Sequence, residues 1–187
     1  YIFDFDDTLV STGSLIRIMD NKGAEVRCMS SADYADALHR DRITEKEKEL
    51  GFYEDFSDFD SYPKDATLLN PIFDIFTQLI DKNRKVIVLT ARGKSYPVKK
   101  FLKDNGIPNV PVYAVGGSDP QLKVNVVEFF ANNHDIDGIS LFEDNEKNIK
   151  AIKSFMENTP GLDFKYVRVP HIDWLSKQKV KRNSRNK

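Results

Sequence analysis

The chain has 187 residues, of which 40% are hydrophobic, and this length fits one globular domain with a sizeable core rather than two. Its 28 basic and 29 acidic side chains nearly cancel, so the overall charge gives no argument for a nucleic-acid or membrane partner. The single cysteine, Cys28, excludes an internal disulfide and a cysteine-rich zinc site. No apolar run approaches the roughly 18 residues of a membrane helix and no signal segment is recognisable, so we expect a cytoplasmic protein without a membrane partner.

Short apolar runs predict the buried strands of a sheet. Each has four to six residues, which is too short for an independent helix. The runs are 1–5, 86–89, 110–115 and 139–142.

Helical patterns with recognisable starts lie between and after these runs. They begin near Asn70-Pro71, Tyr96-Pro97, Asp119-Pro120 and Asn145. Strands that alternate with helices indicate crossover connections. The sequence therefore predicts an α/β fold with a parallel sheet covered on both faces.

The stretch from about 11 to 69 interrupts this alternation. Segments 14–19 and 24–29, joined by Asp20-Asn21-Lys22-Gly23, predict a β-hairpin. Helices are expected over 31–40 and 44–50, whereas 52–62 is aromatic, acidic and irregular, more typical of a small local core than of a base-stacking surface. We interpret 11–69 as an insertion over the edge of the sheet.

We expect one catalytic domain over 1–175, followed by a basic tail over 176–187. The tail holds six lysines and arginines and no acidic residue, which is typical of a flexible, solvated end. A nucleic-acid contact is the alternative interpretation of the tail.

Reactive groups follow three of the predicted strands. The first ends in Asp4-Phe5-Asp6-Asp7-Thr8, the second in Thr90-Ala91-Arg92, and the fourth in Glu143-Asp144 with Asn148 nearby. Ligands of open parallel sheets bind beyond the carboxyl ends of the strands. We therefore expect carboxylates, a hydroxyl and turn amides to meet at one rim.

The carboxylates predict a magnesium site. Asp4 and Asp6 are two positions apart, so on an extended chain they face the same way, whereas Asp7 points away and suits a cap or turn. With Asp144 they form an oxygen-rich group that suits Mg²⁺. Zinc is disfavoured because the three histidines are scattered. The predicted ligands are Asp4, Asp6 and Asp144.

A cation beside a carboxylate suits attack on a phosphate ester, because nucleophile and target are both anionic. Lys123 could complete this neutralisation, although Lys94, Lys99 and Lys100 are alternatives. Asp4 could accept the phosphoryl group.

The remaining groups at the rim fit the same chemistry. Thr90, with the amides around Ala91, could bind phosphoryl oxygens. Asp6 could protonate the leaving oxygen and later deprotonate water. Arg92 fits either a substrate contact or a structural salt bridge.

In order and spacing, these segments resemble the four motifs of the haloacid dehalogenase superfamily. The motifs are Asp4-Phe5-Asp6-Asp7-Thr8-Leu9, Leu89-Thr90-Ala91-Arg92, Lys123, and Glu143-Asp144 with Asn148. The resemblance implies a three-layer Rossmann-like core and an aspartyl-phosphate formed on Asp4 with Mg²⁺. It implies that Asp6 acts as acid and base, that Thr90 and Lys123 hold the phosphoryl group, and that Asp144 binds the metal. The hairpin would be the flap that follows the nucleophile, and the insertion a small cap, as in small phosphatase-like members.

Two positions depart from the family pattern. Many members have Asp or Gly where this chain has Glu143, and Asp where it has Asn148. We expect Glu143 to lie behind the ligands or to reach the metal through water, and Asn148 to orient Asp144.

The predicted function is Mg²⁺-dependent hydrolysis of a phosphorylated small molecule or nucleotide. A polynucleotide 3′-phosphatase or nucleotidase is the alternative within this chemistry, and a catalytically silent binding module is a second alternative. A carbon–halogen hydrolase would not need Asp6, and a phospho-accepting receiver domain would not place its acidic pair after Lys123.

Overall fold

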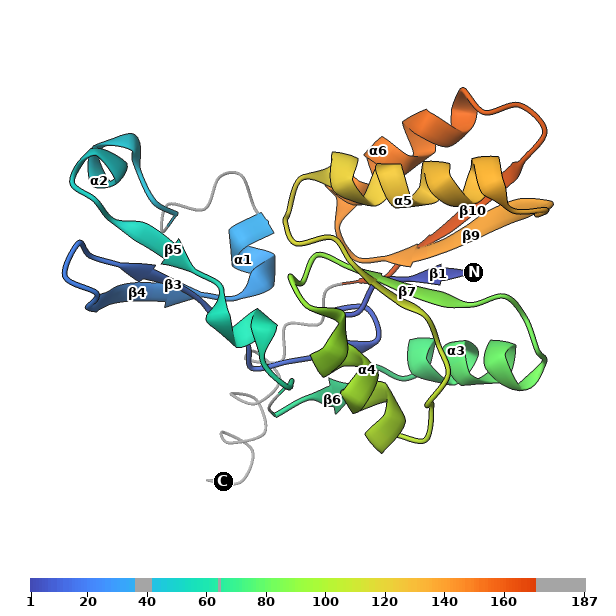
Figure 1. Cartoon of the computed structure of the whole chain (residues 1–187), viewed down its shortest axis with the longest axis horizontal. Helices are drawn as coiled ribbons and strands as arrows, with labels where there is room; N and C mark the ends of the chain where they lie inside the picture. The colour runs from blue at the N-terminus through green and yellow to red at the C-terminus, as the bar shows by residue number, and fades with distance from the viewer. Residues whose placement is uncertain (36–41, 64, 171–187) are drawn as a thin grey trace, which may run out of the picture.

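The computed structural model describes residues 1–35, 42–63 and 65–170. Its centre is a five-stranded sheet in the order β10-β9-β1-β7-β8 (Figure 1). Every adjacent pair is parallel, which confirms the predicted α/β class. The strands are β1 (Ile2–Phe3), β7 (Ile87–Thr90), β8 (Val112–Ala114), β9 (Gly138–Glu143) and β10 (Asp163–Arg168).

Helices cover both faces of this sheet, with α3 and α4 on one side and α5 and α6 on the other (Figure 1). They are α3 (Ile72–Asp81), α4 (Ser95–Asp104), α5 (Pro120–Asn133) and α6 (Glu146–Glu157). Neighbouring side chains of β1 enter different cores because strand residues alternate between faces. Ile2 packs with Val127 and Ile152, whereas Phe3 packs with Phe76 and Val98. The central strand, β1, is therefore packed against an apolar core on each face.

The helix starts follow the predicted signals, with one exception. Asp119 caps α5 by accepting from the Gln121 N–H, and Asn145 caps α6 by accepting from the Lys147 N–H. At α3 the capping position is held by Pro71 rather than Asn70, and no side chain caps this helix. Proline therefore lies one residue before the helix instead of in its first turn.

Strand β10 was not among the predicted strands. It is an edge strand, and most of its residues are exposed. An edge strand with one solvated face does not form a continuous apolar run, so the criterion that found the other four strands fails here.

The predicted hairpin is present within a second, three-stranded antiparallel sheet in the order β4-β3-β5. Its strands are β3 (Ile16–Met19), β4 (Glu25–Met29) and β5 (Tyr53–Asp55). The prediction of irregular structure over 52–62 is wrong in part, because this segment contains β5 and a 3₁₀ helix, η1 (Ser57–Asp60). Strand β5 has only three residues, and two of them are acidic, so it shows no apolar pattern that would predict a strand.

Two short helices and a strand pair complete this region. Helix α1 (Ser31–Ala35) covers the start of the predicted helix 31–40, the rest of which lies outside the described residues. Helix α2 (Glu45–Glu49) begins with a capping box formed by Thr44 and Glu47. Strands β2 (Val10–Ser11) and β6 (Thr67–Leu68) pair where the chain leaves and re-enters the core. The predicted basic tail also lies outside the described residues. No helix within the described ranges has the length and apolar character to cross a membrane.

Candidate active site

The carboxyl ends of β1, β7 and β9 open into a cavity of about 420 Å³. One wall comes from the strand ends and the helices that follow them, and the facing wall comes from the three-stranded sheet region and its connections. Every residue that sequence analysis assigned to the site lines this cavity, and they are Asp4, Asp6, Thr90, Ala91, Arg92, Lys123, Glu143, Asp144 and Asn148. The cavity size is in the range of sites for small organic ligands.

Asp4 is held at the end of the central strand. Its backbone N–H donates to the Phe142 carbonyl at 2.9 Å, so the main chain fixes its position. Its carboxylate is buried and lies 2.9 Å from Lys123 Nζ. Lys123 comes from the first turns of α5 and also contacts Glu143 Oε2 at 2.8 Å. One buried cation therefore bridges two strand ends, which selects Lys123 over the other lysines considered.

Among the described residues, one group of carboxylates has a spacing that could hold a metal ion. Oxygen atoms of Asp4, Glu143 and Asp144 lie within 4.8 Å of one another. In an octahedral Mg²⁺ shell, opposite oxygens are about 4.2 Å apart. Three hard oxygen donors that lie this close together suit Mg²⁺ better than a soft or nitrogen-preferring metal. Formally the group carries three negative charges against the one positive charge of Lys123, so a divalent cation would balance it.

Burial and the mutual repulsion of the carboxylates shift the pKa values of the cluster. Burial, with the nearby charge of Glu143, raises the pKa of Asp4 well above its usual range. Burial and Glu143 also raise the pKa of Asp144 to about 8. Burial alone would lower the pKa of Lys123, but Asp4 and Glu143 outweigh this effect and raise it. A cation in the cluster would replace protons that the carboxylates otherwise retain.

The prediction that Asp6 joins this cluster differs from the structure. Strand β1 ends at Phe3, so the alternation that would align Asp6 with Asp4 stops before Asp6 is reached. Asp7 then adopts a positive φ of 59°, which turns the chain back toward Val10. Glu143 takes the place in the cluster that sequence analysis gave to Asp6.

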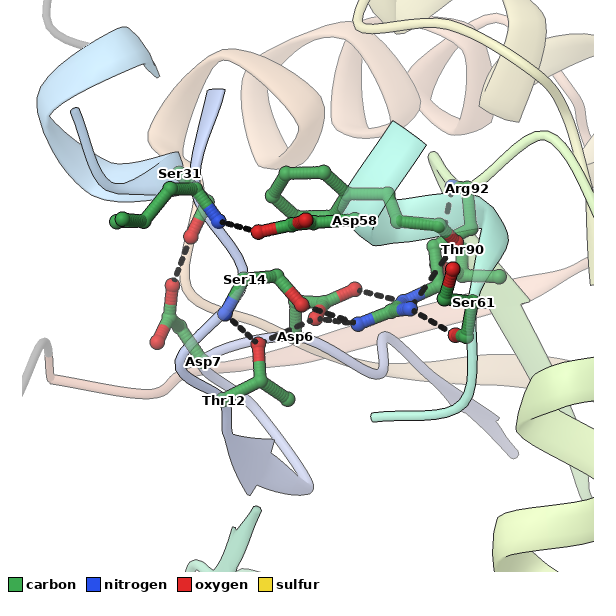
Figure 2. Close-up of polar contacts among 11 residues, drawn as sticks. Asp6, Asp7, Thr12, Ser14, Ser31, Asp58, Ser61, Thr90 and Arg92 are labelled. Atoms are coloured by element: carbon green, nitrogen blue, oxygen red, sulfur yellow. Dashed lines mark hydrogen bonds and ion pairs between the residues drawn. The ribbon is translucent and has the colours of Figure 1, made fainter. Parts of the chain in front are cut away.

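The Asp6 carboxylate instead forms a bidentate ion pair with Arg92 (Figure 2). Arg92 Nε donates to Asp6 Oδ2 at 2.8 Å, and Nη2 donates to Oδ1 at 2.7 Å. Thr12 Oγ1 also donates to Oδ1 at 3.3 Å. This geometry fixes both oxygens of Asp6 at the edge of the cavity.

The other donors of Arg92 reach the insertion. Nη1 donates to the carbonyls of Phe59 at 3.0 Å and Ser61 at 3.3 Å, and Nη2 also contacts Ser14 Oγ at 3.4 Å. The side chain is fully buried, and its donors are all engaged within the protein. Of the two interpretations of Arg92, the structure matches the structural salt bridge.

Two further side chains of the first motif have definite contacts. Thr8 Oγ1 donates to Asp144 Oδ1 at 3.3 Å, which links the first motif to the residue that follows β9. Asp7 accepts a hydrogen bond from Ser31 Oγ at the start of α1 (Figure 2). Sequence analysis treated Asp7 as a cap or turn residue, and the structure uses it to join the turn to the insertion.

Thr90 and Asn148 lie at the rim as expected from their elements. Thr90 ends β7, is buried, and accepts from the Arg92 N–H at 3.2 Å. Its hydroxyl proton can still be donated to a ligand. Asn148 is buried in the first turn of α6 and lines the cavity beside Asp144. Glu143 Oε1 also accepts from the Asn145 N–H at 3.1 Å, which orients this carboxylate.

Sequence analysis missed the facing wall of the cavity. This wall includes Tyr34, Arg42, Phe56 and Phe59. The aromatic segment 52–62 carried the signal, but it was interpreted as a local core, and nothing in the sequence aligned it with Tyr34. The loop from Gly116 to Asp119, which closes another side, also has no motif of its own.

Comparisons of the chain with protein-family models, with curated proteins and with solved structures found no match in any of the three. The case for a function therefore depends on the geometry of this cavity.

Proposed function

We propose that the chain is a Mg²⁺-dependent phosphomonoester hydrolase of the haloacid dehalogenase type, with Asp4 as nucleophile. The observation that carries the proposal is the Asp4 carboxylate, buried on the floor of the cavity, paired with Lys123 and grouped with Glu143 and Asp144. A structural acidic cluster would have no need of a cavity at its centre.

Asp4, Glu143 and Asp144 are the residues that would hold the cation. When bound, Mg²⁺ supplies the positive charge that lets two anions, the carboxylate and the phosphate, approach each other. Lys123 contributes the second positive charge and remains protonated, because its pKa is raised.

In the first step an oxygen of Asp4 attacks phosphorus while the bond to the ester oxygen breaks. The products are an acyl phosphate on Asp4 and the leaving alkoxide oxygen, which takes up a proton from solvent to become the alcohol. Thr90 donates a hydrogen bond to a phosphoryl oxygen, and the backbone around Ala91 offers further N–H donors.

In the second step water attacks the phosphorus of the acyl phosphate, and the Asp4 carboxylate is released with inorganic phosphate. Asp6 takes a proton from this water and returns it to solvent, because both of its oxygens are already hydrogen-bond acceptors of Arg92. The two hydrogen bonds from Arg92 hold Asp6 as an acceptor, which suits the water-activating role most directly.

We further propose that the three-stranded sheet and its connections act as the flap and cap. The hairpin β3–β4 directly follows the first motif, and η1 faces the strand ends through the contacts of Arg92 (Figure 2). Covering the site would exclude water other than the attacking molecule.

The test combines substitution of Asp4 with trapping of the intermediate. Phosphate release from a panel of phosphomonoesters should require Mg²⁺ and should fall by about 10³-fold or more in Asp4→Asn, because the nucleophile is lost. Acid-quenched wild-type protein should carry one phosphoryl group on Asp4 by mass spectrometry. Asp6→Asn should accumulate this species, because its hydrolysis is slowed.

Asp135→Asn is the matched control, since Asp135 is an exposed acid in the loop before β9. It should leave both activity and trapping unchanged. Undiminished turnover by Asp4→Asn, or equal turnover in excess chelator, contradicts the mechanism.

A further inference from the structure

The wall of the cavity that faces the carboxylates is aromatic. Tyr34 comes from α1, whereas Phe56 and Phe59 come from η1 and the residue before it. One end of the cavity, here called the phosphate end, is lined by Asp4, Thr90 and Lys123. These polar groups and the aromatic rings of the insertion therefore line one continuous space.

Contacts within the protein fix the positions of these rings without burying them completely. Tyr34 and Phe56 meet edge to face, with ring centroids 5.4 Å apart. The Tyr34 hydroxyl donates to Glu54 Oε2 at 2.8 Å, and the Arg42 guanidinium lies 4.1 Å from the centre of the Tyr34 ring. Phe56 nevertheless keeps 41% of its surface exposed. An exposed ring with a fixed orientation, beside a cavity, is a surface for another ring.

Phe59 supports the same wall from behind. Its ring packs against the small core of the three-stranded sheet, and the Arg92 guanidinium lies 5.3 Å from its centre. Since Arg92 also pairs with Asp6, the aromatic wall and the proton-transferring carboxylate share one support. The distance between the two ends of the cavity is thereby set by the fold.

The cavity is larger than a phosphoryl group alone requires. Its volume of about 420 Å³ leaves room for an organic leaving group beside the rings once the phosphate end is occupied. Flat heteroaromatic rings stack well on such side chains, and Arg42 adds a cation that favours electron-rich rings.

From this arrangement we infer that the substrate is a phosphomonoester whose alcohol carries a flat ring, of the nucleoside monophosphate class. The inference rests on the proposed function for the reaction at Asp4. The ring lies against Phe56 and Tyr34 while the phosphate faces Asp4 and Lys123.

The experiment compares adenosine 5′-monophosphate with ribose 5-phosphate, which has the same sugar and phosphate but no flat heteroaromatic base. Wild-type kcat/KM should favour the nucleotide by about ten-fold or more, the size expected from one base stacked on aromatic side chains. Phe56→Leu keeps apolar bulk but removes the ring. It should lower kcat/KM for the nucleotide about ten-fold and leave that for ribose 5-phosphate unchanged.

Phe129→Leu is the matched control, because Phe129 is a comparably exposed phenylalanine on α5 that does not line the cavity. It should change neither substrate. Equal kcat/KM for the two substrates in the wild type, or equal losses on both in Phe56→Leu, overturns the inference while leaving the proposed hydrolysis intact.

Binding of adenosine 5′-monophosphate, measured by calorimetry on wild type and Phe56→Leu, tests the ring pocket independently of turnover. Weaker binding by Phe56→Leu without hydrolysis of either substrate would support the pocket and contradict the proposed function. No difference in binding between the two proteins would contradict the pocket.

Discussion

The two sheets of this molecule are held together in different ways. The five-stranded sheet lies between two apolar cores, each containing several fully buried side chains. The three-stranded sheet has a small core on one face, built around Ile16, Ile18 and Met29. The carboxylates belong to the first region and the aromatic wall to the second. The proposed chemistry thus lies on the region with the larger apolar cores, and the proposed substrate contact on the region with the smaller core.

The smaller region also contains several ion pairs. Arg17 contacts Asp58 and Glu25, and Arg27 contacts Glu47. These pairs are partly exposed, so each contributes little by itself. The fully buried Arg92 is different, because it links this region to Asp6 in the core region. The comparison predicts that substitutions in the two regions differ in size and in the property affected.

The largest loss of stability should follow a cavity in the main core. Phe76 is fully buried and contacts Phe3 edge to face at 5.1 Å. Phe76→Ala should lower the free energy of unfolding by about 3–5 kcal/mol, measured by urea denaturation. Ile18→Ala in the small core should cost about 2 kcal/mol, because a small cluster can partly collapse around the gap. Ile75→Ala, on the exposed side of α3, is the control for Phe76. Equal losses for Phe76→Ala and Ile18→Ala would contradict the comparison.

The next largest effect should come from Arg92. Arg92→Met keeps much of the side-chain volume but leaves Asp6 and two carbonyls without their partner, which should cost about 3 kcal/mol. The variant should also lower kcat, because Asp6 loses its fixed orientation.

Arg17→Met separates this link from an ordinary ion pair. Arg17 also pairs with two carboxylates but is more exposed, and its loss should cost less than about 1 kcal/mol. Both measurements use thermal denaturation and steady-state kinetics. Equal effects of the two substitutions would show that Arg92 does not couple the regions.

A smaller change in folding stability should appear when the pH is varied in the presence of a chelator. The pKa of Asp144 is about 8 in the folded protein, against an ordinary value of 3.8. Between these values the folded protein holds more protons than the unfolded chain, so stability should fall as pH rises from about 5 to 8. We expect a change of about 1 kcal/mol or more, which is roughly 2–4 °C in Tm.

Addition of Mg²⁺ should reverse this trend, because a cation bound by the carboxylates stabilises their ionised forms. The gain in Tm on adding Mg²⁺ should therefore increase with pH. A gain that is the same at pH 5 and pH 8 would show that Mg²⁺ does not bind at the cluster.

The smallest effect should be local to the insertion. Hydrogen bonds from Arg27 and then from Thr44 lower the pKa of Glu47 to about 2. The contribution of this contact is complete above the ordinary pKa of 4.5 and is lost as pH falls toward 2. Glu47→Gln should speed amide exchange in α2 without changing exchange in β1. Faster exchange in β1 as well would indicate that the two regions unfold as one unit.

The sequence predicts the elements of the core region well because apolar runs and capping residues are local signals. The starts of α5 and α6 follow directly from Asp119 and Asn145. The edge strand β10 escaped because a solvated strand lacks an apolar run, and β5 escaped because it has only three residues, two of them acidic. Pairing of β5 with β3 depends on contacts between distant residues, which no local pattern encodes.

The site was predictable to the same extent. The strand ends identified Asp4 and Asp144, because parallel strands bring these ends together, and Lys123 was found in the first turns of the helix that follows the third predicted strand. The exchange of Asp6 for Glu143 depends on where β1 stops, and a shift of one or two residues in a strand end lies below what a sequence pattern defines. The choice between the two interpretations of Arg92 required knowing where the carbonyls of the insertion lie.

The contact of Arg92 with the insertion has a consequence for how such a protein could change its substrate. On the insertion side, Arg92 binds the main-chain oxygens of Phe59 and Ser61 and the hydroxyl of Ser14. Main-chain oxygens are present whatever side chain a residue carries. The residues of η1 that face the cavity can therefore be exchanged during evolution while this part of the attachment to Asp6 is preserved. If the proposed function holds, substrate selectivity can then change without moving the carboxylate proposed to transfer protons.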